Sequence, residues 1–130
     1  MAVNGKFKFK SSEYRVIEFT HEMHRVLDGR GAPSSQPSPG FIHLTIEATD
    51  TNVFAGWAFS GSQSEDGEII LSKRDSEATM RSLKFKDAYV FGYKEHYSAN
   101  DDSPATISLS ITPKEIQLTP DSIDWIADWV

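Results

Sequence analysis

Residues 41–47 read Phe-Ile-His-Leu-Thr-Ile-Glu, and this stretch decides the fold class. Ile42, Leu44 and Ile46 fall on one face of an extended chain, and the residues between them fall on the other face. Strict alternation of this kind is typical of a β-strand that buries one side and exposes the other. The stretch therefore predicts a half-buried strand.

Five further strands are expected from similar patterns, at about residues 6–10, 14–26, 68–73, 80–97 and 106–112. In the second of these, Val16, Ile17 and Phe19 do not keep one phase, which predicts a β-bulge. Glu65-Asp66-Gly67 has the composition of a hairpin turn, so we expect a turn just before the strand at 68–73. These strands make up most of the regular structure that the sequence predicts.

A single short helix is expected at about residues 51–59, because Phe54 and Trp57 fall at helical spacing after Asp50 and Thr51, either of which suits an N-cap. Many evenly spaced strands with one helix indicate a mainly β fold, a closed or nearly closed antiparallel β-barrel with one short α-helix. The side chains expected in its core are Phe7, Phe9, Val16, Phe19, Ile42, Leu44, Ile46, Phe54, Trp57, Ile69, Leu71, Leu83, Phe85, Phe91, Leu109 and Ile111.

Composition excludes several classes of protein. At 130 residues the chain has the length of one domain, and it has no cysteine, which rules out a disulfide scaffold and cysteine-ligated metal. The net charge of −6 argues against nucleic acid as a partner, because binding phosphates requires a basic face. No signal-peptide-like or membrane-spanning apolar run occurs, so we expect synthesis in the cytoplasm and no membrane insertion.

No pattern of catalytic residues stands out. His21-Glu22-Met23-His24 resembles a fragment of a zinc-protease motif, but its histidines are three apart on an expected strand and so should point to opposite faces. The chain contains no Gly-x-Ser-x-Gly nucleophile elbow and no phosphate-cradling glycine motif followed by a helix. We therefore expect no catalytic residue, no cofactor and no metal.

Two segments point to interactions instead. Residues 28–40 form a long Gly/Pro/Ser loop without a large apolar side chain, which is typical of a functional arm or a disordered linker. Thr106, Ser108 and Ser110 form a ladder of hydroxyl groups opposite the apolar face of their strand. This ladder fits a water-facing strand rich in β-formers, and it also fits a surface that faces a neighbouring subunit or an internal channel.

The order of these segments resembles that of Hcp, the tube protein of bacterial type VI secretion systems, in its divergent TssD branch. The most specific motifs are the turn Lys73-Arg74-Asp75 and the strand opening Phe85-Lys86-Asp87-Ala88-Tyr89. The resemblance covers nearly the whole chain. It implies one Hcp-like tube domain over residues 1–130, with an extended loop at 28–40. Residues 119–130 follow the motifs that carry the resemblance, and we expect them to form a C-terminal extension.

The resemblance also implies a structural function and no enzymatic one. Proteins of this kind form homohexameric rings that stack into the inner tube, carry effector cargo, meet sheath, spike and baseplate proteins, and are secreted through the apparatus without a signal peptide. It assigns the long loop to ring stacking, and Thr106, Ser108 and Ser110 to a channel or subunit face. The stacking residues would be Asp28, Gly29, Arg30, Pro33, Ser34 and Ser35.

Two other functions remain open from the sequence. One is a monomeric small β-barrel that binds a small apolar ligand, although the many bulky aromatic residues should fill such an interior. The other is an enzyme.

At the C-terminus, Ile123, Ile126 and Trp129 share a face at helical spacing, so we expect this segment to be ordered only against an apolar surface.

Overall fold

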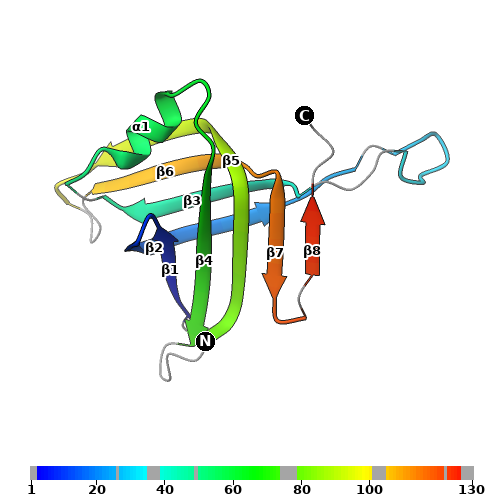
Figure 1. Ribbon diagram of the computed structural model, residues 1–130, viewed down its shortest axis with the longest axis horizontal. Helices are drawn as coiled ribbons and strands as arrows, with labels where there is room; N and C mark the ends of the chain where they lie inside the picture. Colours follow the sequence, from blue (N-terminus) through cyan, green and yellow to red (C-terminus); the bar gives the residue numbers. More distant parts are fainter. Residues whose placement is uncertain are drawn as a thin grey trace.

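The computed structural model describes residues 3–25, 27–34, 39–48, 50–73, 79–100, 105–121 and 123–126. Most of the regular structure is β-strand, and a short helix lies between the third and fourth strands along the chain (Figure 1). The elements are β1 (Val3–Phe9), β2 (Ser12–Glu22), β3 (Phe41–Glu47), α1 (Val53–Phe59), β4 (Glu65–Lys73), β5 (Thr79–Tyr97), β6 (Ala105–Thr112), β7 (Glu115–Thr119) and β8 (Ile123–Ile126).

The strands close into a barrel. Their order is β4-β1-β2-β3-β6-β5, every pairing is antiparallel, and β5 also pairs with β4, which completes a six-stranded ring. β7 pairs with the first half of β5 and β8 pairs with β7, so these two strands extend the sheet beyond the barrel. The predicted mainly β barrel with one helix is confirmed.

Two strands take part in both walls of the barrel. β2 pairs with β1 up to Arg15 and with β3 from Val16 onward, and its register shifts between Val16 and Glu18, which confirms the predicted bulge. β5 pairs with β4 and β7 over its first half and with β6 from Tyr89 onward. Because β2 and β5 each pass from one sheet to the other, the barrel consists of two facing sheets. One is the β1–β4 sheet, which also includes β7 and β8, and the other is the β3–β6 sheet.

Aromatic side chains fill the end of the barrel that α1 covers. Phe54 and Trp57 point from α1 into the interior, where Trp57 stacks on Phe9 at 5.1 Å and on Phe85 at 6.3 Å between ring centroids. Phe7 lies between Phe9 and Phe85 in the same cluster. The indole Nε1 of Trp57 donates a hydrogen bond of 3.1 Å to the carbonyl of Ala88, so its polar atom is satisfied.

Some local predictions were wrong. Phe91 is 56% exposed because the register of β5 shifts between Val90 and Gly92, and the extra residue turns outward. Glu65-Asp66-Gly67 lies inside β4 and is no turn, since β4 begins at Glu65 and pairs there with β5. The residue that precedes α1 is Asn52, and it makes no side-chain capping bond.

The chain after β6 differs most from expectation. β7 and β8 were not predicted, and β8 places Ile123 and Ile126 in a strand where helical spacing was expected. Both side chains are exposed. Trp129 lies outside the described residues, as do Arg74 and Asp75 of the turn expected at Lys73-Arg74-Asp75. No helix in the described part of the chain is long and apolar enough to cross a lipid bilayer.

Candidate assembly surfaces

The arm, residues 28–40, begins with a compact turn that Asp28 organises. Its carboxylate oxygen Oδ1 accepts hydrogen bonds from the backbone N–H groups of Arg30, at 2.8 Å, and Ala32, at 3.0 Å. The backbone N–H of Asp28 donates to the Ala32 carbonyl at 2.7 Å. Gly31 has φ +85°, a value that glycine adopts without strain. The turn is thus held by its own hydrogen bonds although it projects away from the barrel (Figure 1).

The far end of the arm is fixed to the barrel. Pro39 is fully buried, and its carbonyl accepts a 2.6 Å hydrogen bond from Nε2 of His21. Gly40 has φ +84°, and a Cβ atom there would lie 2.2 Å from the carbonyl oxygen of Glu22. Although the loop has no large apolar side chain, it is thus buried at Pro39, because the returning chain packs beside the end of β2.

The predicted stacking residues are all at the surface where the structure describes them. Asp28, Gly29, Arg30, Pro33 and Ser34 are exposed, and Pro33 forms an isolated β-bridge with Leu27. Ser35 lies outside the described residues, as do positions 36–38. The exposed turn is therefore available for contact with another molecule, whereas the anchored end is not.

The predicted hydroxyl ladder lies on the outward side of the β3–β6 sheet. Ile107, Leu109 and Ile111 point into the core, so Thr106, Ser108 and Ser110 face away from it. Ser108 lies opposite Thr45 of β3, and their hydroxyl oxygens are 2.9 Å apart, within hydrogen-bonding distance. The ladder is thus within hydrogen-bonding distance of the neighbouring strand β3 at Ser108.

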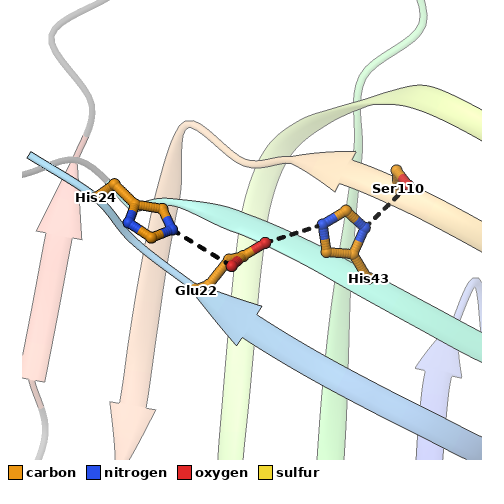
Figure 2. Close-up of polar contacts among 4 residues, drawn as sticks. All are labelled: Glu22, His24, His43 and Ser110. Carbon is orange, nitrogen blue, oxygen red and sulfur yellow. Dashed lines mark hydrogen bonds and ion pairs between the residues drawn. The ribbon is translucent and has the colours of Figure 1, made fainter.

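Figure 2 shows a chain of polar contacts that continues this ladder toward the end of β2. Ser110 Oγ lies 3.0 Å from Nδ1 of His43, whose Nε2 lies 3.4 Å from Oε1 of Glu22. The other carboxylate oxygen of Glu22 lies 3.4 Å from Nε2 of His24. The His43 tautomer that carries its proton on Nε2 fits both contacts, because the Glu22 carboxylate only accepts and Nδ1 can then accept from the Ser110 hydroxyl.

Ser110, His43 and Glu22 have the functional groups of a nucleophile, a base and an orienting acid, but the backbone around Ser110 is not arranged as in a hydrolytic site. Ser110 lies in the middle of β6, whose backbone pairs with β3 on one side and β5 on the other. Its neighbouring N–H groups are therefore committed to the sheet and form no oxyanion hole. Among the residues that the structure describes, no group of three His, Asp or Glu side chains is placed to hold a metal ion.

Aromatic side chains border this polar chain. Phe41 at the start of β3 and Phe91 on β5 meet edge to face, with ring centroids 5.4 Å apart, and the ring of His43 lies 6.2 Å from that of Phe91. Both phenylalanines are largely exposed. The outward side of the β3–β6 sheet thus combines short hydroxyl groups, one carboxylate between two imidazoles, and a pair of solvent-facing aromatic rings.

Sequence reasoning did not find the link from Glu22 to His43. The expectation that His21 and His24 point apart agrees with their contacts, since His21 binds Pro39 while His24 approaches Glu22. His43, however, is brought to Glu22 by the pairing of β2 with β3, in which His43 lies opposite Thr20. The available signal was the placement of His43 on the polar side of its strand, but the register between the strands could not be read from the sequence.

Comparison with known proteins places this architecture in one family. The family model of hemolysin coregulated protein Hcp (TssD) matches residues 1–130. The chain is 26% identical to Hcp1 from Flavobacterium johnsoniae, with a TM-score of 0.85 over 95% of this chain and 98% of that one. No curated protein matches the chain.

More distant Hcp proteins share the fold. Hcp1 from E. coli gives a TM-score of 0.73 at 13% identity, and Hcp3 from Pseudomonas aeruginosa, described as a secreted protein, gives 0.65 at 12%. In both comparisons 99% of each chain is covered. The match over the whole length and the shared barrel lead to one conclusion: the chain belongs to the Hcp (TssD) family of type VI secretion tube proteins.

Proposed function

We propose that the chain forms hexameric rings that stack into the inner tube of a type VI secretion system and carry effectors through the central channel. After synthesis in the cytoplasm the protein would meet sheath, spike and baseplate proteins and leave through the apparatus itself. The observation that carries this proposal is the difference between the two outward surfaces of the barrel, because a channel wall and an external wall need different chemistry.

The outward side of the β1–β4 sheet carries long basic side chains. Four exposed lysines alternate with core residues on this side: Lys6 and Lys8 on β1, and Lys84 and Lys86 on β5. The outward side of β6 carries only short hydroxyl groups where the structure describes it, and Ser108 is hydrogen bonded across to β3. Short neutral groups would let diverse cargo pass without strong ion pairing, which supports β6 as part of the channel wall. The strands beside β6 add charged groups to this side, since exposed Lys94 lies opposite Ser108 and exposed Glu47 lies opposite Thr106.

The arm supports the stacking part of the proposal. A ring needs a heterologous interface between subunits, and stacking needs complementary upper and lower surfaces. The turn at Asp28 is exposed and already held by hydrogen bonds, so less conformational entropy would be lost when it docks on an adjacent ring. Arg30 is exposed in this turn and would meet an acidic partner group.

Electron microscopy and native mass spectrometry test the stacking role. Replacing residues 32–38 with a Gly/Ser linker of the same length should leave single hexameric rings but abolish tubes. The matched control replaces residues 98–104, a polar segment of the same length between β5 and β6, and should still form tubes. A wild-type monomer at micromolar concentration would contradict the ring, and normal tubes from the arm variant would contradict the stacking role.

Cysteine labelling tests the channel wall, because the natural chain has no cysteine of its own. In assembled tubes, Ser108→Cys on the outward side of β6 should react with a small maleimide and resist one that carries a bulky polymer. Asn4→Cys is the matched control, since Asn4 is exposed on the outward side of β1. Equal labelling of both variants by the bulky reagent would exclude the β3–β6 sheet as the channel wall.

A further inference from the structure

The end of the barrel opposite α1 holds a cavity of about 390 Å³. It lies between the end of β2, the second half of β4, the start of β5, and β7 (Figure 1). Its lining residues are Phe19, Thr20, His21, Ile69, Leu71, Arg81, Ser82, Leu83 and Leu118. We propose that this cavity binds a small amphipathic anion, an aliphatic or aromatic body that carries a single carboxylate.

Five of the nine residues that line the cavity are apolar, and the other four are polar. Ile69 and Leu83 belong to the buried core, whereas Phe19, Leu71 and Leu118 are only partly buried. Side chains of this kind gain free energy when an apolar group replaces water against them. The volume is also within the range of pockets that take small molecules. An apolar ligand body would therefore complete burial that the described residues leave unfinished at this end.

The polar groups of the lining define the charged end of the ligand. His21 already donates to the Pro39 carbonyl, and the hydroxyl groups of Ser82 and Thr119 bond to each other. Arg81 makes no ion pair with any carboxylate of the residues that the structure describes, and the cavity lining contains no acidic residue. The guanidinium is always charged and matches a carboxylate with two parallel hydrogen bonds. Charge complementarity thus selects an anion over a neutral or cationic ligand.

Lys84 provides a matched comparison for Arg81. It lies on the same strand and is exposed, but it is directed outward opposite Glu68 of β4 and does not line the cavity. Removing its charge changes the net charge of the protein by the same amount as removing that of Arg81. Any difference between the two variants therefore reports the cavity and not the overall electrostatics.

Octanoate and its uncharged analogue octanamide are the probes, added to the purified full-length protein in its native oligomeric state. We expect saturable binding of octanoate by calorimetry, with methyl NMR shifts concentrated at Leu71, Leu83 and Leu118. Arg81→Gln should weaken octanoate binding about tenfold or more, the range for a lost hydrogen bond to a charged group, and leave octanamide unaffected. Lys84→Gln should leave both unaffected, and circular dichroism should show both variants folded.

The proposal does not depend on ring formation, so it stands or falls separately from the tube function. Octanoate and octanamide binding with equal affinity would overturn the assignment of a carboxylate. Equal effects of Arg81→Gln and Lys84→Gln would overturn the role of Arg81. Methyl shifts spread over the outer surface, or no saturation at millimolar octanoate, would overturn the cavity as a binding site.

Discussion

The two ends of the barrel are completed in different ways. At one end α1 inserts Phe54 and Trp57, and the rings of Phe7, Phe9 and Phe85 pack around them with no more than 1% exposure. At the other end Phe19, Leu71 and Leu118 remain partly exposed around a cavity of about 390 Å³. α1 covers one end only, and the described residues leave the lining of the opposite end partly exposed, as a ligand site requires.

The largest expected effect comes from opening the helix end. Trp57→Ala removes a fully buried ring and leaves the Ala88 carbonyl without its donor, so we expect a loss of about 3–5 kcal/mol in the free energy of unfolding. Urea denaturation measures this loss of stability. Phe59→Ala in the same helix is the control, because Phe59 is 79% exposed, and it should change stability by about 0.5 kcal/mol or less. Similar losses for both variants would mean that α1 does not close the barrel.

The sequence predicted the helix end better than the open end, and the reason is physical. α1 and the strands around it each bury one complete face, so their apolar periodicity is unambiguous, as at Ile42, Leu44 and Ile46. β7 and β8 are short and only partly buried, and their pattern carries little signal. Phe91 was misplaced because a bulge changes the phase of a strand without leaving a mark in its composition.

The candidate surfaces also differ in how far they could be predicted from the sequence. The outward direction of Thr106, Ser108 and Ser110 follows from alternation within one strand, and the structure agrees with it. The contact between Glu22 and His43 and the cavity beside Arg81 depend on strand register and on barrel closure. These features depend on tertiary structure, so they cannot be predicted from a single sequence when the strand register is unknown.

Adding volume at the helix end should also destabilise the barrel. A Cβ atom at Gly67 would lie 2.6 Å from Cζ of Phe85 and 2.9 Å from Cε1 of Phe7, both in rings that neighbouring aromatic side chains hold in place. We therefore expect Gly67→Ala to cost about 1–3 kcal/mol in urea denaturation. Gly61→Ala is the control, since a Cβ atom there meets nothing within 4 Å. A neutral Gly67→Ala variant would show that the aromatic cluster has room to adjust.

Adding volume at the open end should have the opposite sign. Leu118→Phe places extra carbon atoms beside the cavity, where they replace water, and cavity filling of this kind commonly stabilises a protein by about 0.5–1 kcal/mol. The midpoint of thermal unfolding should rise, and octanoate binding should weaken because the space is occupied. If Leu118→Phe destabilises the protein as much as Gly67→Ala does, the two ends are equally well packed and the comparison fails.

The smallest expected effect concerns Tyr93, which lies at the rim of the helix end with its ring 5.5 Å from that of Phe59. Burial, together with the hydrogen bond and the charge of Glu95, raises the pKa of Tyr93 from 10.0 to about 12. Between these two pH values the unfolded chain loses the phenol proton while the folded protein keeps it. The free energy of unfolding should therefore fall as pH rises through this range, and only slightly, because Tyr93 remains partly solvated.

In an ultraviolet absorbance titration, Tyr93→Phe should remove a component that titrates near pH 12, with little change in stability at neutral pH. Loss of a component near pH 10 instead would place Tyr93 in open solvent and outside the packed rim.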